Sequence, residues 1–515
     1  MKHRTANCPG CGGPVEFKTA SSLVTICDFC QSAVARGDKK VEDYGKVADV
    51  GETNSGLRIG LTGTYNKKHF FITGRVRYQH PAGGVWDEWY LSFPGERWGW
   101  LAEAQGKFYL LFARKLNDDH KLPPFDQVKA AAEIRIGSTD YHVREKGVAT
   151  AIAADGEIPW AFRPGAEHHF VDLNGPLKEF ATLEYGETVN VFTGNEVRLD
   201  ELGVDTSNAH PDSGKMTVAA LKLSCPHCGG SLTLRAPDQS ERITCPSCDR
   251  LLDIKDGHLS VFETLKKRNV TPVIPIGSEG TIKGDKYTVI GFMERYATYE
   301  GKHYPWEEYL LHHSQLGFRW LVCNQKHWSF VEPASLTTSG TADRISFNGR
   351  SFRIYDRGTA YVRYVLGEFY WRVRVGETVA TADYIAPPQM LSIERSSTAK
   401  SEEVSVSIGT YMQLEEIERA FGLKDLARPW GCGPISPKPD IGFGVFLWWG
   451  LFLIALFLIN GYYYTGYATT GSDMWLMLYG MIGVSLPPIG VMFYLHNFEV
   501  QRWKDSDFSP YASSD

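Results

Sequence analysis

Cysteine pairs with metal-ligand spacing are the clearest chemical signal in this 515-residue sequence. A CxxC pair, a spacer of 15 or 16 residues and a second CxxC pair occur near the N-terminus and again in the middle of the chain. The ligand candidates are Cys8, Cys11, Cys27, Cys30, Cys225, Cys228, Cys245 and Cys248. Four thiolates at this spacing can surround Zn²⁺ tetrahedrally. The sequence therefore predicts two zinc ribbons, each holding one structural ion, with iron as an alternative metal.

The cysteine sets favour a structural role for the metal over catalysis. A closed site of four thiolates leaves no open position for water or substrate. The alternative interpretation, redox-active CxxC pairs of the thioredoxin type, would require a neighbouring βαβ pattern, which the sequence does not show. The metal is therefore expected to hold a small fold together.

An aromatic-acid strand offers a second candidate site. Trp86 and Glu88 lie on one face of a predicted strand, and Trp306 and Glu308 repeat the pattern later in the chain. A carboxylate beside an indole ring can receive a cationic ligand, so these residues are possible ligand-binding residues. The alternative is a structural ion pair, with Arg97 or Arg319 as the partner, and this alternative is favoured.

The remaining reactive residues do not form a catalytic constellation. We find no nucleophile elbow, phosphate loop, dinucleotide fingerprint or metalloprotease helix motif, so the chain is predicted not to be an enzyme. Two pairs of adjacent histidines, His168-His169 and His312-His313, would point to opposite faces of a strand and make poor joint ligands. They are predicted to be surface or loop histidines.

The elements around these residues are arranged as a tandem duplication. The cysteine sets recur at an offset of 217 or 218 residues, and the residues that follow them recur at offsets from 211 to 220. Short aromatic and β-branched runs, separated by glycine and asparagine about every ten residues, are typical of an antiparallel β-barrel or sandwich. The predicted units are zinc ribbon 1 (1–40), β-module 1 (50–205), zinc ribbon 2 (221–256) and β-module 2 (270–427).

The ribbon, the Trp-acid-acid-aromatic strand, a later Trp-Leu pair (100–101 and 320–321) and the duplication resemble bacterial proteins that carry domain of unknown function 4178. The resemblance covers most of residues 50–200 and 270–415. It implies tandem modules with zinc ribbons and a C-terminal membrane hairpin, a bacterial source, and a link to envelope-stress or polyamine gene neighbourhoods. The family has no established activity to carry over.

The C-terminal part of the sequence is strongly apolar. Residues 441–460 carry no charge, and residues 474–496 contain no Lys, Arg, Asp or Glu. Because about 20 apolar residues cross a bilayer as a helix, two transmembrane helices are predicted, with a re-entrant hairpin as the alternative for the second segment. Basic residues precede the first segment and follow the second, and the loop between the segments has no Lys or Arg. This asymmetry places both ends in the cytoplasm, and Trp503 is expected at the inner interface. The predicted location is the bacterial inner membrane.

Charge narrows the range of partners. The net charge is −6, and neither ribbon has the dense basic stripe that neutralises phosphates, so the sequence does not predict a nucleic-acid partner. The expected function is a membrane-anchored cytoplasmic scaffold that uses the duplicated modules to bind an unidentified protein partner. Two alternatives are a receptor or enzyme for a small, polyamine-like cation on the aromatic-acid strand, and a nucleic-acid-binding ribbon protein.

Overall fold

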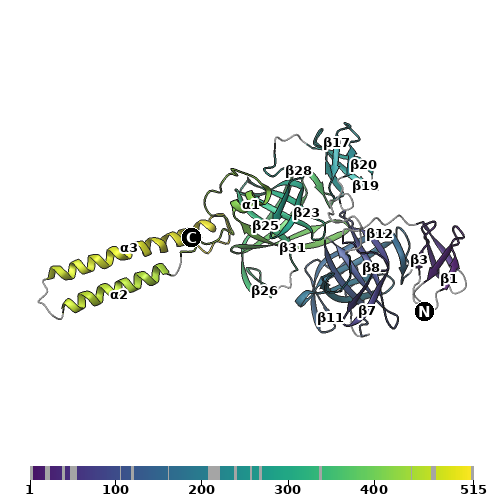
Figure 1. Ribbon diagram of the computed structural model, residues 1–515, viewed down its shortest axis with the longest axis horizontal. Helices are drawn as coiled ribbons and strands as arrows, with labels where there is room; N and C mark the ends of the chain where they lie inside the picture. The colour runs from purple at the N-terminus through teal and green to yellow at the C-terminus, as the bar shows by residue number, and fades with distance from the viewer. Residues whose placement is uncertain are drawn as a thin grey trace.

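A computed structural model shows a mainly antiparallel β protein from which two helices project (Figure 1). This confirms the predicted fold class. The structure describes residues 4–17, 24–36, 41–46, 55–104, 106–117, 121–160, 162–206, 221–236, 240–255, 258–265, 270–335, 339–441, 444–464 and 471–511.

Module 1 is a closed antiparallel barrel. In order of pairing, its wall consists of β7 (Lys68–Gln79), β8 (Val85–Phe93), β9 (Arg97–Ala104), β10 (Lys107–Ala113), β15 (Val189–Val197), β14 (Glu179–Tyr185), β13 (Glu167–Asn174) and β12 (Thr139–Ile158). The second half of β12 pairs with β7 and closes the ring. Short strands β6 (Thr62–Tyr65) and β11 (Glu133–Ile136) extend β7 and β12. Module 1 also contains two short 3-10 helices among its described residues, η1 (Phe125–Gln127) and η2 (Pro176–Lys178).

Module 2 repeats this barrel strand for strand. Its wall consists of β22 (Asp285–Tyr299), β23 (Lys302–His313), β24 (Gly317–Asn324), β25 (His327–Pro333), β31 (Ser401–Met412), β30 (Gln389–Ser397), β29 (Thr378–Ala386) and β28 (Arg350–Phe369). The second half of β28 closes the ring on β22. The outer strands are β21 (Glu279–Ile282), β26 (Ser339–Thr341) and β27 (Arg344–Phe347).

A glycine stands at the same place in both barrel closures because the backbones approach closely there. A Cβ atom on Gly74 would lie 2.2 Å from the carbonyl oxygen of Glu157, and one on Gly291 would lie 2.5 Å from that of Glu368. Both separations are far below van der Waals contact, so a larger residue at either position would push the closing strands apart.

Each ribbon is attached to its own barrel at an equivalent position. Ribbon 1 contains β1 (Arg4–Asn7), β2 (Pro14–Phe17), β3 (Val24–Ile26), β4 (Ser32–Arg36) and β5 (Val41–Lys46), and ribbon 2 contains β16 (Leu221–Ser224), β17 (Ser231–Leu234), β18 (Arg242–Thr244), β19 (Arg250–Lys255) and β20 (His258–Thr264). β3 pairs with the end of β12, and β18 pairs with the end of β28. The duplicated unit therefore includes the docking of the ribbon as well as its fold.

The two barrels also contact one another. Residues 145–147 of β12 pair with residues 401–403 of β31, so one strand ladder runs from module 1 into module 2. A second contact joins the turn between β7 and β8 to module 2, where the Arg372 backbone N–H donates to the carbonyl oxygen of Ala82 at 3.1 Å. These hydrogen bonds fix the relative position of the two modules.

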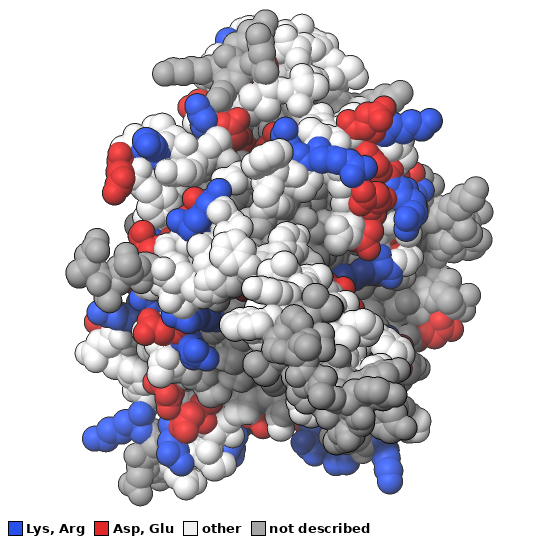
Figure 2. Space-filling model, turned by 90° about the vertical axis from the view of Figure 1, so that its left-hand side faces the viewer, with Lys and Arg blue, Asp and Glu red and all other residues white. Residues whose placement is uncertain are grey.

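Within the described residues, three helices follow the module 2 barrel. The first, α1 (Leu414–Phe421), packs Leu414 and Ile417 against the barrel, and Gly422 ends it in the left-handed conformation. The other two, α2 (Gly444–Tyr464) and α3 (Gly471–Arg502), run side by side away from the β modules (Figure 1). Seen from the far end of this hairpin, uncharged atoms occupy the middle of the view, and Lys/Arg and Asp/Glu side chains are interspersed around them (Figure 2).

The prediction of two membrane spans requires correction. Within the described residues, one helix, Met477–Arg502 of α3, is long and apolar enough to cross a membrane. The apolar stretch of α2 is shorter, Gly444–Ile459. Pro487 and Pro488 lie inside α3 without ending it, so the second predicted segment, for which a re-entrant hairpin was the alternative, is the one that meets the length requirement.

The end of α3 is anchored in module 2, which also corrects the role predicted for Trp503. Its indole is buried and lies 5.4 Å from the ring of Tyr355, whereas an interface anchor would face lipid. Arg502 is buried as well and donates to the carbonyl oxygens of Pro434 and Ser436 at 2.9 and 2.8 Å. The apolar helix is thus attached to the barrel through hydrogen bonds and aromatic packing.

Candidate metal centres and ligand cavity

The eight predicted cysteine ligands gather into two clusters, as the spacing predicts. In each cluster the four Sγ atoms lie within 4.8 Å of one another. The Sγ–Sγ separations between the two CxxC turns are 3.6 and 3.7 Å in ribbon 1 and 3.8 and 3.7 Å in ribbon 2. A tetrahedron with metal–sulfur bonds of about 2.3 Å has edges of about 3.8 Å, so both clusters fit a tetrahedral metal ion.

Matched backbone turns position the cysteines. In ribbon 1 the backbone N–H of Gly12 donates to the carbonyl oxygen of Cys8 at 2.8 Å, and in ribbon 2 Gly229 donates to Cys225 at 2.9 Å. Gly12 and Gly229 have φ angles of 77° and 70°, which glycine adopts without strain. The two thiols of each CxxC pair therefore face the same centre before any ion is bound.

The chemistry of the clusters requires a cation if all the sulfurs are to ionise. Burial, opposed by hydrogen bonds from the backbone N–H groups of Ser247 and Cys248, raises the pKa of the Cys245 thiol to about 12. None of the eight thiols forms a disulfide. A divalent ion with affinity for sulfur would stabilise the thiolates and tie the two halves of each ribbon together.

Ribbon 2 is held to its barrel by a buried carboxylate. Glu368, which is fully buried, accepts hydrogen bonds from the backbone N–H groups of Arg235 at 2.8 and 2.9 Å and of Ala236 at 3.1 Å. The hydroxyl of Ser240 donates to the same side chain at 3.0 Å. Because these donors follow the first CxxC turn, the fold of the ribbon and its docking depend on one another.

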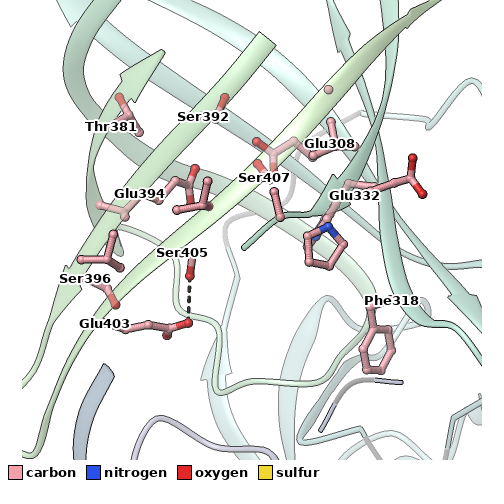
Figure 3. Close-up of a pocket in the computed structure, with 18 of the residues that line it drawn as sticks. Glu308, Phe318, Glu332, Thr381, Ser392, Glu394, Ser396, Glu403, Ser405 and Ser407 are labelled. Carbon is pink, nitrogen blue, oxygen red and sulfur yellow. Dashed lines mark hydrogen bonds between the residues drawn. The ribbon is translucent and has the colours of Figure 1, made fainter. Parts of the chain in front are cut away.

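A large cavity extends over both modules. Its volume is about 1,290 Å³, and its wall includes Trp86, Glu88, Trp306 and Glu308, the candidate ligand-binding residues of the aromatic-acid strands. Figure 3 shows the module 2 part of the wall, where Glu308 and Glu394 lie among hydroxyl-bearing side chains. The cavity brings together residues that lie 220 positions apart in the sequence, Trp86 with Trp306 and Glu88 with Glu308.

The two glutamates differ in their partners. Glu88 accepts hydrogen bonds from the Tyr90 hydroxyl at 3.0 Å and from the Trp86 indole N–H at 3.5 Å. Glu308 accepts from the Trp306 indole N–H at 2.7 Å and pairs with Arg295 at 3.1 Å. The structural ion pair favoured from the sequence thus exists in module 2, but with Arg295 as the partner.

The arginines named for that role have other contacts. Arg319 lies 3.8 Å from Glu332, and the Arg97 guanidinium lies over the ring of Phe112. The sequence-based choice of partner was therefore wrong for Glu308, because β23 has a neighbouring strand on each side and the sequence alone does not show which of them carries the partner.

Further carboxylates that sequence reasoning missed lie in equivalent positions of the two barrels. Strand register matches Asp172 with Asp383, Glu184 with Glu394 and Glu145 with Asp356. Each pair is separated by 210 or 211 residues. The same offset already relates residues 141–160 to residues 352–371, so applying it to all acidic residues would have revealed these pairs.

One position in this matched set changes its chemistry. Tyr78 in β7 stands opposite Trp86, and Arg295 in β22 stands opposite Trp306, at the same register of the two barrels. The Arg295 guanidinium bridges Glu308 and Glu394 at 3.1 and 2.8 Å and lies 5.7 Å from the centre of the Trp306 ring. In module 1 the uncharged Tyr78 ring stacks on Trp86 with a centroid separation of 5.1 Å.

Burial shifts the pKa values of the module 1 carboxylates upward. Burial, opposed by the hydrogen bonds from Tyr90 and Trp86, raises the pKa of Glu88 to about 7. Burial and the charges of Glu88 and Asp172 raise the pKa of Glu184 to about 8. In module 2 burial also raises the pKa of Glu308, but the charge of Arg295 opposes this effect.

The histidine prediction is wrong for one residue of each pair. His168 lies in β13 and lines the cavity, with its Nε2 atom 3.8 Å from a carboxylate oxygen of Glu184. Burial and the neighbouring His169 lower the pKa of His168 to about 4, so this ring is neutral at pH 7 and does not neutralise Glu184. His312 is buried in β23.

Comparison with solved structures returns only weak likenesses. A structure of MucB in complex with MucA(peri) is 10% identical, covers 70% of this chain and 95% of its own, and gives a TM-score of 0.10. The complex structure of Pseudomonas aeruginosa MucA/MucB is 10% identical, covers 70% and 94%, and gives a TM-score of 0.09. At these scores the likeness supports no inference about fold or function. No curated protein matches the chain.

A family model, described as "Domain of unknown function (DUF4178)", matches residues 58–199 and 275–414, which together are more than half of the chain. The first match covers the wall of the module 1 barrel, and the second covers the wall of the module 2 barrel. The predicted resemblance is thereby confirmed, and the protein belongs to the DUF4178 family, with one copy of the domain in each barrel.

Proposed function

We propose that this protein is a membrane-anchored binding protein that holds a small molecule in the cavity between its two barrels and catalyses no reaction. The proposal rests on the cavity of about 1,290 Å³, whose wall combines aromatic rings with carboxylates from both modules. Ligand sites are typically concave, largely apolar and supplied with a few convergent polar groups. The cavity has this character, and its volume is ample for a metabolite.

The fold supports binding by keeping the two halves of the cavity in one arrangement. The pairing of β12 with β31 joins the barrels, and the C-terminal segment after α3 lines the cavity through Lys504, Asp505, Ser506 and Asp507. In this proposal the ribbons each hold one zinc ion and brace the ends of β12 and β28. The metal contributes folding free energy and takes no part in binding the ligand.

The proposed location is the cytoplasmic face of a bacterial inner membrane, with α3 as the anchor. Thiolate clusters suit a reducing compartment, and the basic residues before α2 suit the cytoplasmic side. The length and apolar character of Met477–Arg502 support insertion of this part of the chain into an apolar phase.

The test is a thermal-unfolding measurement on the full-length protein in detergent micelles, using the dialysable small-molecule fraction of a bacterial extract as the probe. The fraction should raise the unfolding temperature of the wild type. Ser407→Trp, which fills part of the cavity, should abolish the shift, whereas Ser351→Trp on an exposed strand end outside the cavity should retain it. Equal shifts for both variants, or no shift for the wild type, would overturn the proposal.

The scaffold for a protein partner and the nucleic-acid-binding ribbon stay predictions from the sequence. The face in Figure 2 intersperses acidic and basic side chains, whereas phosphate binding favours a continuous basic surface. The cavity gives the small-ligand alternative a specific structural feature, and we therefore place that alternative first.

A further inference from the structure

Given the proposed ligand cavity, on which this inference rests, the geometry points to one class of ligand. We propose that the module 1 end of the cavity binds a small organic cation with a guanidinium or primary ammonium head group. Glu88 and Glu184 would balance its charge, with Trp86 beside it, in the role that Glu308, Glu394 and Trp306 have toward Arg295.

Module 2 supplies the template for this site. Arg295 is 8% exposed, and its guanidinium contacts Glu308 and Glu394 and lies over the Trp306 ring. A buried cation in this place is stabilised by charge-assisted hydrogen bonds to both carboxylates and by the electrons of the indole face. The second barrel thus shows that this arrangement of residues binds a guanidinium group.

Module 1 keeps the acidic and aromatic residues of the template but lacks its cation. Strand register places Glu88, Glu184 and Trp86 where module 2 has Glu308, Glu394 and Trp306, while Tyr78 replaces Arg295. Among the described residues no Lys or Arg forms an ion pair with Glu88 or Glu184. Glu88 is buried and the Glu184 side chain is 26% exposed, and two such interacting carboxylates are costly unless a positive charge joins them.

The arginine that module 1 does contain serves another group of acids. The Arg144 guanidinium donates to the Tyr109 hydroxyl at 3.2 Å, and its charge acts on Glu145, Asp172 and Glu403. Burial raises the pKa of Asp172 to about 7, with the charge of Glu145 adding to the rise and Arg144 opposing it. The charge of Arg144 does not lower the pKa of Glu88 or Glu184 in the same way. The negative charge of these two carboxylates is therefore not balanced by Arg144.

Access to the site favours a small ligand. The residues that line this end of the cavity include Trp86, Glu88, His168 and Asp172. A cationic head group can therefore contact Glu88 directly, and Glu184, which does not line the cavity, would attract it through its charge at a longer distance. Tyr78, which is buried, stacks on Trp86 and lies 4.9 Å from the His168 ring, so Trp86 and His168 form the aromatic surface that faces the cavity here. The aliphatic part of the ligand would extend into the cavity along apolar groups such as Leu111 and Phe180, which also line it.

Isothermal titration calorimetry on the full-length protein in detergent micelles tests the proposal. The probe is butylguanidinium, and butylurea is the neutral control of the same shape. The wild type should bind one butylguanidinium per chain and bind butylurea at least tenfold more weakly. The double variant Glu88→Gln/Glu184→Gln should lose at least tenfold in affinity, whereas Glu187→Gln, an exposed acid on the turn after β14, should bind as the wild type does.

A second variant gives module 1 the buried arginine of module 2. Tyr78→Arg places an internal cation where module 2 carries Arg295, so it should abolish butylguanidinium binding and raise the thermal stability. If Tyr78→Arg fails to fold, the double glutamine variant still decides the question, because it preserves side-chain volume.

The proposal is overturned if butylguanidinium does not bind, if butylurea binds equally well, or if the double glutamine variant binds with wild-type affinity. Failure of this inference is separable from failure of the proposed function. If butylguanidinium does not bind but the extract fraction still stabilises the wild type and not Ser407→Trp, the cavity binds a ligand of another class. If neither probe has an effect, both proposals fail.

Discussion

The two barrels share their fold and their acidic interior, but they place their internal arginines differently. Module 1 has Arg144 in β12 and Tyr78 in β7, whereas module 2 has Tyr355 and Arg295 at the equivalent positions. Arg144 faces Glu145 and Asp172, while Arg295 faces Glu308 and Glu394. The exchange leaves a different part of each acidic interior without a cation, so duplication kept the framework and changed where the negative charge is balanced.

The same contrast applies to the strand edges near these arginines. In module 1 the edge of β12 at residues 145–147 is covered by β31 of module 2. In module 2 the equivalent part of β28 meets the end of α3, where the Tyr355 hydroxyl donates to the carbonyl oxygen of Arg502 at 3.0 Å. Module 1 is thus completed by its neighbour, and module 2 is completed by the end of the apolar helix.

The largest effect is expected from removing a metal ligand in a ribbon. The ribbons are the parts in which the two repeated units are most alike. Cys27→Ser or Cys245→Ser removes one of four ligands, and structural zinc contributes about 10–16 kcal/mol in zinc-finger peptides. Elemental analysis should show bound metal falling from two ions to one per chain in either variant.

Cys432→Ser, which lies outside both clusters, should retain both ions. Loss of both ions from a single ligand substitution would contradict the independence of the two ribbons. Finding iron in place of zinc would leave the cluster geometry intact but correct the identity of the metal.

A smaller effect is expected from removing the internal cation of module 2. Arg295→Met leaves Glu308 and Glu394 close together without a positive charge, and breaking a buried ion pair in this way costs about 3–5 kcal/mol. Hydrogen exchange of β23 should report the loss.

Combining Arg295→Met with Glu308→Gln should recover part of the stability, because one of the two stranded charges is then neutral. In module 1, Tyr78→Phe removes no charge. The opening free energy that hydrogen exchange reports for β8 should therefore change by about 1 kcal/mol or less. Equal losses in the two modules would contradict the difference between their interiors.

The smallest expected effect is a pH-dependent gain of stability in module 1. Because the folded-state pKa of Glu88 is about 7 and its ordinary value is 4.5, the folded protein binds a proton more tightly than the unfolded chain. Stability from this group is fully present below pH 4.5 and is lost as the pH rises through 7. Glu88→Gln should therefore stabilise module 1 at pH 8 by about 1–3 kcal/mol and have little effect at pH 5.

Hydrogen exchange of β8, corrected for the intrinsic rate at each pH, would measure this gain. The other titratable groups around the site are Tyr78, Tyr90, His168, Asp172 and Glu184. Glu308→Gln is the matched change in module 2 and should destabilise, since it removes a partner of Arg295. The same sign in both modules would show that Arg295 does not distinguish them.

Several features were predictable because they depend on local spacing. The CxxC pairs lie on single turns, so their metal-ligand geometry follows from a few residues, and the aromatic runs indicate strands wherever they occur. The duplication is visible in the sequence because it requires only comparison of the chain with itself. The apolar helix follows from the absence of charge over residues 474–496.

The inward-facing acids were not predictable in the same way. Asp172, Glu184 and their counterparts lie on strands with mixed patterns, and which face of a strand points into a closed barrel depends on the register of its neighbours. The ion-pair partner was expected to be Arg97 or Arg319, whereas Glu308 pairs with Arg295 on the adjacent strand β22. His168 was placed at the surface because a histidine pair in a polar stretch gives no sign of the enclosing strands.

The sequence by itself determined that this chain would form two ribbons with four cysteines each, two repeated β units and an apolar helix near its end. Those outcomes depend on residues close together in the sequence, where backbone geometry limits the possible arrangements. Only the tertiary structure decided that the barrels close on matched glycines, that the end of α3 is buried in module 2, and that Tyr78 stands where Arg295 stands in the other copy. Barrel closure joins strands that are far apart in the sequence, and the charges that meet inside depend on that closure.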